Sequence, residues 1–171
     1  MNNSIKSYNL GNKYYFGKGA DHDYKKALRL YLKSFEEGNS DKELVIRIGN
    51  MYYNGMGVKQ NYSVAAQWYH KIAESDPVAQ FNLGLMYDFG NGVKQDYTEA
   101  KKWYLRSAEQ GNADAQFNLA ALYANGEGVE VDYNEAAHWL NEAAELGDKD
   151  AKIWLERLYE AVPFVKKICK K

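Results

Sequence analysis

Histidine, cysteine and carboxylate side chains are the groups that most often catalyse reactions or bind metal ions. In this sequence they do not occur in clusters with a recognisable spacing. Its three histidines, His22, His70 and His138, lie at unrelated places, and none has a metal-ligand or catalytic-triad spacing with Asp or Glu. The single cysteine, Cys169, cannot form a disulfide within the chain, which favours a reducing compartment. We therefore expect no enzymatic activity, no metal site and no cofactor.

The composition is typical of a globular protein: 171 residues, 46% hydrophobic and 26% charged. No segment approaches the roughly 20 apolar residues that span a bilayer, and residues 1–6 lack the apolar core of a secretory signal. We expect a cytoplasmic protein, although a secretory signal that had already been removed would not be visible in this sequence. The net charge of −1 gives no reason to expect nucleic-acid binding. Residues 1–60 are net basic and residues 91–160 net acidic, a polarity that bears on partner orientation.

All 14 glycines fall on one repeating pattern, Gly-x-x-Tyr-x-x-Gly-x-Gly followed by Asp-Tyr-x-x-Ala-x-x-Trp and a final glycine. The four copies have Gly11, Gly49, Gly84 and Ala120 at their first position, spaced 35 to 38 residues apart. This period is typical of stacked helical hairpins. The sequence therefore predicts a repeat protein rather than a globular enzyme core.

Each copy predicts a first helix A, a glycine-rich loop and a second helix B. Asp76 precedes Pro77, a cap followed by proline at the first helical position. Asp96 and Asp132 each precede a glutamate by three residues, the spacing of a capping box. Asp23 and Asn61 are the corresponding caps of the first two copies.

The first glycine of each copy falls inside helix A, where glycine costs roughly 1 kcal/mol against alanine. Its recurrence at Gly11, Gly49 and Gly84 predicts a close approach between helices, where any side chain would collide. Ala120 fits the same reading because alanine is the next smallest residue.

The stretches Leu83–Val93 and Asp96–Tyr104 resemble the Sel-1-like repeat, a relative of the tetratricopeptide repeat. The resemblance implies an all-α fold, a right-handed α-solenoid of stacked antiparallel helix hairpins. It implies one domain over residues 1–161 and a basic C-terminal tail over 162–171. Within the domain the expected parts are repeats at about 5–40, 41–75, 76–111 and 112–147 and a capping helix at 148–161.

In tetratricopeptide relatives, certain helix A positions line a concave groove, so the resemblance implies a binding site there. One such position is occupied in turn by Asn9, Arg47, Asn82, Asn118 and Trp154. The partner-binding residues expected from the resemblance are Asn9, Asn12, Tyr15, Arg47, Asn50, Tyr53, Asn82, Leu85, Asp88, Asn118 and Arg157. Asparagine can pair with both groups of a peptide bond, and arginine can hold a carboxylate. Alternatively, Asn82 and Asn118 bond only their own neighbouring loops. The pattern itself does not require Asn9, Arg47, Asn82 or Asn118.

We therefore predict a non-enzymatic adaptor that binds a protein or peptide partner, as Sel-1-like proteins do in bacterial signalling, secretion and host contact. One alternative is a dedicated inhibitor or immunity protein for a single enzyme or toxin; a hydrolase-like enzyme is a second. Phe164, Val165 and Ile168 follow the capping helix, and their exposure would allow a weak homodimer through the C-terminal end.

Overall fold

The computed structural model describes residues 3–168, which form ten α-helices and no strand. The all-α prediction is confirmed. The chain divides into two compact units, residues 1–75 and 76–171, at the boundary expected between the second and third repeats. No helix of the described residues is long and apolar enough to cross a membrane.

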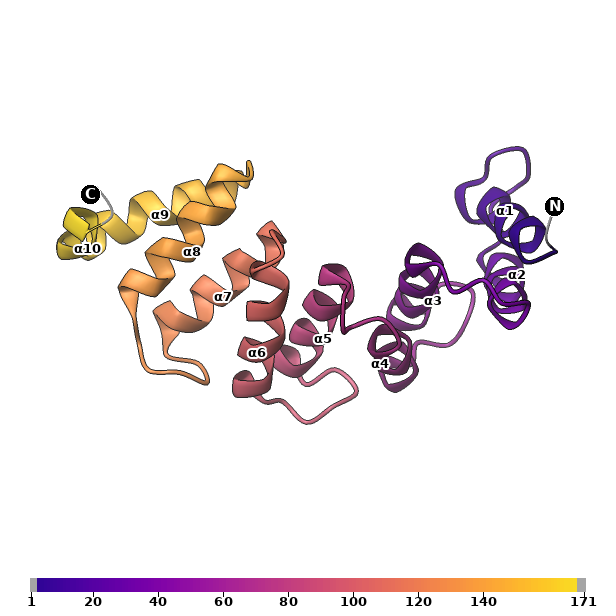
Figure 1. The fold of residues 1–171 in the computed structure, drawn as a ribbon, viewed down its shortest axis with the longest axis horizontal. Coiled ribbons are helices and arrows are strands. Elements are labelled where there is room, and N and C mark those ends of the chain that lie inside the picture. The colour runs from indigo at the N-terminus through magenta and orange to yellow at the C-terminus, as the bar shows by residue number, and fades with distance from the viewer. Residues whose placement is uncertain (1–2, 169–171) are drawn as a thin grey trace. The chain divides into compact units, whose positions relative to one another are not determined.

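The first unit contains two helical hairpins (Figure 1). Its helices are α1 (Asn3–Phe16), α2 (Tyr24–Glu36), α3 (Lys42–Asn54) and α4 (Tyr62–His70). Helix α1 packs against α2 and α3 against α4, and α2 also contacts α3. The buried apolar side chains between them include Leu28, Leu44 and Ile48.

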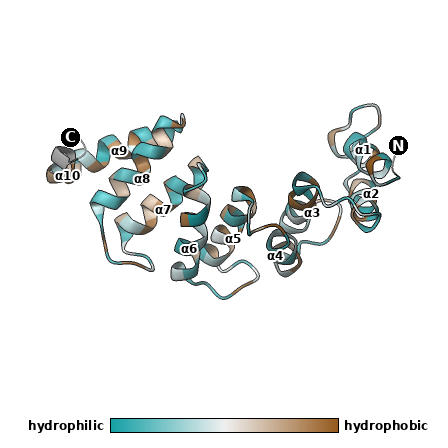
Figure 2. Cartoon of the chain, in the orientation of Figure 1, coloured by the Kyte–Doolittle hydropathy of each residue, from teal (hydrophilic) through white to brown (hydrophobic). Residues whose placement is uncertain are grey.

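The second unit contains two further hairpins and a C-terminal pair of helices (Figure 1). Its helices are α5 (Pro77–Phe89), α6 (Tyr97–Ala108), α7 (Ala113–Asn125), α8 (Tyr133–Glu145), α9 (Lys149–Ala161) and α10 (Pro163–Ile168). Helix α9 lies within the residues for which a capping helix was predicted, and it packs against α8. We call α1, α3, α5 and α7 the A helices, and α2, α4, α6 and α8 the B helices. Most helices carry both hydrophilic and hydrophobic residues, so a helix can bury its apolar side against a neighbour (Figure 2).

The predicted caps are confirmed, but the capping boxes are not. The side chains of Asp23, Asn61, Asp76, Asp96 and Asp132 all accept hydrogen bonds from first-turn backbone N–H groups. A capping box also requires the third-residue glutamate to accept from the cap's own N–H. The N–H of Asp96 instead donates to the carbonyl of Tyr87 (2.9 Å), and that of Asp132 donates to Tyr123 (2.9 Å). This bond ties the start of helix B to the last turns of helix A.

The glycine inside each A helix faces a tyrosine ring of the B helix. A Cβ atom added at Gly11, Gly49 or Gly84 would lie closer than 3.0 Å to the ring of a fully buried tyrosine. The pairs are Gly11 with Tyr31, Gly49 with Tyr69 and Gly84 with Tyr104. The close approach predicted from the glycines is therefore chiefly a contact between the tyrosine ring of helix B and the backbone of helix A. In the fourth hairpin, Ala120 and Leu140 occupy the two positions.

The second glycine of a loop packs against the preceding hairpin. Gly57 has a φ of 72°, and a Cβ there would collide with the backbone of Tyr24 at the start of α2. Gly128 has a φ of 67° and meets the backbone of Tyr97 at the start of α6 in the same way. Only glycine satisfies both the positive φ and the close contact, so these positions fix how successive hairpins stack within each unit.

The end of the chain differs from the predicted tail. Residues 163–168 form α10, which packs against α8 and α9. Val165, expected to be exposed, is fully buried in the core that contains Leu155 and Ala151, so that expectation was wrong. Phe164 is exposed. The side chain of Ile168, together with Cys169 and the last two lysines, lies outside the described residues.

We expect the effect of Gly84→Ala on stability to depend on Tyr104. Overpacking a core costs about 1–3 kcal/mol, whereas replacing a mid-helix glycine by alanine gains about 1 kcal/mol. Because Tyr104 is fully buried, the clash should dominate and Gly84→Ala should lower the free energy of unfolding. In a Tyr104→Leu background, which reproduces the Ala120–Leu140 pair, Gly84→Ala should be neutral or stabilising. Urea unfolding of the unaltered protein, the two single variants and the double variant measures this double-mutant cycle. An equal loss of stability from Gly84→Ala in both backgrounds would contradict the prediction.

Candidate functional site

Three of the predicted site residues accept a hydrogen bond from a buried tyrosine of the B helix. The bonds run from Tyr31 Oη to Asn12 Oδ1 (2.8 Å), from Tyr69 Oη to Asn50 Oδ1 (2.7 Å) and from Tyr104 Oη to Asp88 Oδ2 (2.8 Å). Each tyrosine thus runs from helix B, past the helix A glycine, to a polar side chain of helix A. These acceptors have a structural role in addition to any contact with a partner.

Burial keeps the phenols of Tyr31 and Tyr69 protonated, as a hydrogen-bond donor must be. It raises the pKa of Tyr31 to about 12, and it raises the pKa of Tyr69 as well. Burial also raises the pKa of Asp88, although the hydrogen bond from Tyr104 acts in the opposite direction. The first two hairpins avoid this desolvation of a charge because their acceptors, Asn12 and Asn50, are neutral amides.

Arg47 lies at the centre of the candidate site in the first unit. Its Nη1 donates to Asn12 Oδ1 (3.0 Å) and to Tyr31 Oη (3.3 Å), while its Nη2 donates to the carboxylate of Glu43. The Arg47 side chain is only 11% exposed, whereas that of Glu43 is 67% exposed. The expectation that the scaffold does not use Arg47 was therefore wrong: its charge helps to hold α1, α2 and α3 together.

Aromatic rings enclose the same guanidinium. Its Cζ lies 4.9 Å from the ring centroid of Phe16, 5.1 Å from that of Tyr15 and 5.7 Å from that of Tyr31. Such cation–π contacts favour the charged form and fix the planar group in place. A cavity of about 220 Å³ opens beside it, lined by Tyr15, Phe16, Glu43, Ile46, Arg47 and Asn50. Three of the predicted residues, Tyr15, Arg47 and Asn50, thus line one cavity, and a fourth, Asn12, bonds Arg47.

The other predicted residues of the first unit lie outside this cavity. Asn9 is exposed on α1. Tyr53, half-buried near the end of α3, makes an edge contact with Tyr62, with ring centroids 4.9 Å apart. Its carbonyl accepts from Gln60 Nε2 (2.8 Å).

In the second unit, the predicted residues are spread over three helices. Asn82 Nδ2 donates to the carbonyl of Val78 (2.8 Å), so it bonds its own helix rather than a loop. Leu85 of α5 packs against the apolar core formed by α6 and α7, and Asn118 is half-buried on α7. Arg157 is exposed on α9, with its guanidinium 5.6 Å from the ring centroid of Trp154.

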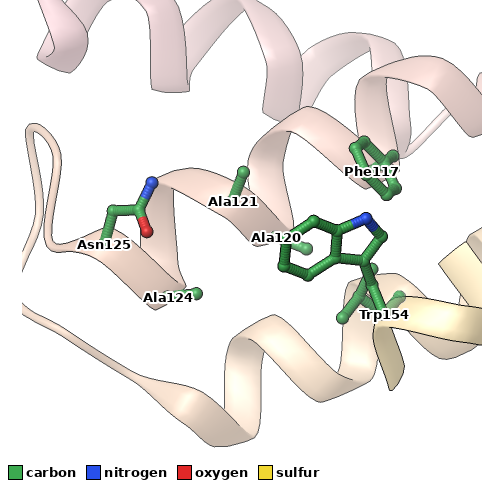
Figure 3. A pocket seen from close by; sticks show the side chains of 7 residues that line it. Phe117, Ala120, Ala121, Ala124, Asn125 and Trp154 are labelled. Carbon is green, nitrogen blue, oxygen red and sulfur yellow. The ribbon is translucent and has the colours of Figure 1, made fainter. Parts of the chain in front are cut away.

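Trp154 was not among the predicted site residues, although it occupies the position of Asn118 in the preceding copy. Its side chain is 52% exposed, and its ring contacts that of Phe117, with centroids 6.5 Å apart. Figure 3 shows the indole beside a pocket of about 150 Å³. The pocket is lined by Phe117, Ala120, Ala121, Ala124, Asn125, Leu140 and Trp154. A signal was present in the sequence: an aromatic residue stands where every other copy has Asn or Arg.

Within residues 3–168, no group of three or more His, Cys, Asp or Glu side chains could hold a metal ion. The first unit offers a fixed cation with aromatic walls, and the second offers a small apolar pocket. In protein interfaces generally, a fixed guanidinium can hold a carboxylate and an apolar pocket can hold a side chain.

Comparison with known protein families identifies four repeats. The Sel1 repeat matches residues 7–39, 45–76, 77–112 and 113–148. These ranges follow the four hairpins and stop before α9. A comparison with curated proteins gave no match.

Solved structures of similar proteins share the fold. A Sel1 repeat protein from Oxalobacter formigenes is 33% identical with a TM-score of 0.83, over 92% of this chain and 64% of the other. The protective antigen c5321 of uropathogenic Escherichia coli is 36% identical with a TM-score of 0.82, over 93% of this chain and 34% of the other. A sel1 repeat protein from Klebsiella pneumoniae is 23% identical with a TM-score of 0.53, over 92% of this chain and 78% of the other, and supports the fold alone. The chain thus spans less than two thirds of the length of the first two.

We expect Asp88→Asn to stabilise the protein at neutral pH. Asparagine keeps an acceptor for Tyr104 Oη but removes the desolvation of a charge. Because the pKa of Asp88 is raised in the folded state, the folded protein binds the proton more tightly, and stability is lost as the pH rises through that pKa. The gain from Asp88→Asn should therefore vanish at pH values below the ordinary range of aspartate, where the residue is protonated in both states.

Urea unfolding at neutral and acidic pH measures this difference. A gain from Asp88→Asn that is equal at both pH values would refute the assignment to desolvation.

Proposed function

Because the chain belongs to the Sel1 repeat family, we propose that it is a non-enzymatic scaffold that binds a protein or peptide partner through the exposed faces of its A helices. Sel1 repeat proteins are generally protein–protein interaction scaffolds. The observation that supports this surface most strongly is the Arg47 cluster. A guanidinium held between rings, next to a cavity with amide and phenol groups, is prepared to bind a carboxylate.

In this proposal, Glu43 occupies the place of the partner's carboxylate in the free protein. Glu43 and Arg47 are one helical turn apart on α3, and most of the Glu43 side chain is exposed. Because the Glu43 carboxylate faces solvent, water can solvate it when the pair separates, although the guanidinium itself is largely buried. Glu43 can therefore rotate into solvent while a carboxylate of the partner takes over the Nη2 donor. The bonds from Nη1 to Asn12 and Tyr31 keep the guanidinium in place during the exchange.

The other exposed groups of the A helices would bind the partner's backbone. An asparagine side chain offers both a donor and an acceptor to a peptide group. Asn9 and Asn118 lie on the first and last A helices, and the Oδ1 atom of Asn82 can accept while its Nδ2 bonds Val78. Arg157 adds a second exposed cation in the other unit.

We expect the double variant Arg47→Ala/Asn82→Ala to lose partner capture. The protein would be immobilised, exposed to extract of its source cell, and the bound proteins quantified by mass spectrometry. Because Arg47 also bonds Asn12 and Tyr31, we expect preserved helicity with a modest fall in melting temperature, so capture is compared well below both transitions. The matched control, Arg29→Ala/Asn134→Ala, alters exposed residues of B helices and should capture normally. Equal capture by the folded double variant would refute the proposed surface.

Glu43→Ala should have the opposite effect on affinity. If Glu43 competes with the partner for Arg47, its removal should strengthen binding of the captured partner, as measured by titration calorimetry. Glu99→Ala removes a comparable exposed pair, with Lys102, and should leave the affinity unchanged. Weaker binding by Glu43→Ala would contradict the exchange. A single tight one-to-one partner would indicate a dedicated inhibitor, and several weak partners would indicate an adaptor.

A further inference from the structure

The fourth hairpin has lost the tyrosine that the first three share. Tyr31, Tyr69 and Tyr104 each fill the space between a B helix and the glycine of its A helix. In the fourth hairpin the corresponding B-helix residue is Leu140, which is shorter and lacks a hydroxyl. Ala120 replaces the glycine, and its Cβ occupies part of the space where the ring would lie.

The acceptor of the tyrosine hydroxyl has been lost together with the ring. Asn12 and Asn50 correspond to Ala121, and Asp88 corresponds to Ala124. Both alternative acceptor positions of the fourth hairpin are therefore alanine. The ring, the glycine and the polar partner have changed as a set.

This set of small residues leaves a pocket that the other hairpins fill from within. Ala120, Ala121, Ala124 and Leu140 all line the cavity of about 150 Å³. Figure 3 shows the three alanines along α7 with the indole of Trp154 opposite them. An apolar cavity of roughly this size, about 150 Å³, binds benzene in an engineered protein. The space therefore suits one phenyl ring.

The aromatic residues at the pocket favour a ring over an aliphatic chain. Phe117 and Trp154 meet with their ring planes 74° apart, an edge-on arrangement that leaves ring surface available to a third aromatic group. Trp154 is 52% exposed, an apolar surface that a partner would cover. The lining has no charged side chain, and its polar side-chain groups are the Asn125 amide and the Trp154 indole.

We propose that this pocket binds the phenyl ring of a phenylalanine side chain presented by a peptide partner. The inference rests on the proposed binding role of the A helices, because five of the residues that line the pocket belong to α7, the last A helix. The partner's ring takes the place that Tyr31, Tyr69 and Tyr104 take in their own hairpins. The fourth hairpin thus exchanges an internal ring for a specificity pocket.

The test uses N-acetyl-phenylalanine amide as the probe and the Trp154 indole N–H resonance as the signal, assigned with Trp154→Phe. We expect a saturable shift of this resonance in the unaltered protein. Ala124→Leu fills the pocket from α7, and Ala120→Gly/Leu140→Tyr refills it as in the other hairpins. Both variants should raise the dissociation constant of the probe at least about tenfold. Ala124 is half-buried, so the first variant should fold even if the second does not.

Lys152→Leu, which adds the same side chain at an exposed position of α9 outside the pocket, is the matched control and should bind the probe normally. N-acetyl-leucine amide and N-acetyl-cyclohexylalanine amide test the preference for an aromatic ring. The proposal is overturned by the absence of a saturable shift, by equal binding in the filled variants, or by equal binding of the aliphatic probes.

A second copy of the chain is the competing occupant, because Phe89 and Phe164 are exposed. Sedimentation that shows a dimer lost in Ala124→Leu would overturn the peptide assignment in favour of self-association. The probe experiment needs no natural partner and alters neither Arg47 nor Asn82. If the probe does not bind, the proposed role of the pocket is refuted, but partner capture through Arg47 and Asn82 is not affected. If partner capture fails, the result of the probe experiment does not change.

Discussion

The contact of a helix A glycine with a helix B tyrosine ring is the constraint on which the rest of the structure depends. A ring lying directly on a backbone sets the separation of the two helices in each of the first three hairpins. It also directs the hydroxyl to a fixed side chain of helix A, at Asn12, Asn50 or Asp88. Because the ring is fully buried, its donor must be satisfied there. Packing and polar chemistry are therefore coupled through one side chain.

This coupling gives the candidate site residues two roles. Asn12 accepts from both Tyr31 and Arg47, so it belongs to the framework as well as to the exposed A-helix face. Arg47 in turn bonds α1 and α2 from α3, and the rings around it restrict its rotamers. A group fixed in this way loses little entropy on binding, which favours affinity. Because of the same contacts, we expect substitution of Arg47 to affect stability as well as the proposed recognition.

Much of the fold could be predicted from the sequence because its signals are local. The repeated glycines, the caps at Asp23, Asn61, Asp76, Asp96 and Asp132, and the capping helix depend on residues near one another in the chain. The site depended on distant pairings. Tyr31 meets Asn12 across 19 residues, and Arg47 meets Asn12 across 35, so no pattern within one helix reveals either bond. The burial of Val165 depends likewise on the packing of α10 against α8 and α9.

The fourth hairpin shows what the constraint permits when it is relaxed. Leucine with alanine is still a compact apolar pair, and Leu140 is only 6% exposed, so the hairpin closes without the tyrosine. The next helix, α9, packs against α8. It carries Trp154 at a position that the other copies give to Asn or Arg. Relaxing the internal packing and adding an exposed indole occur at the same place, and together they create an apolar pocket where the other hairpins have a filled core.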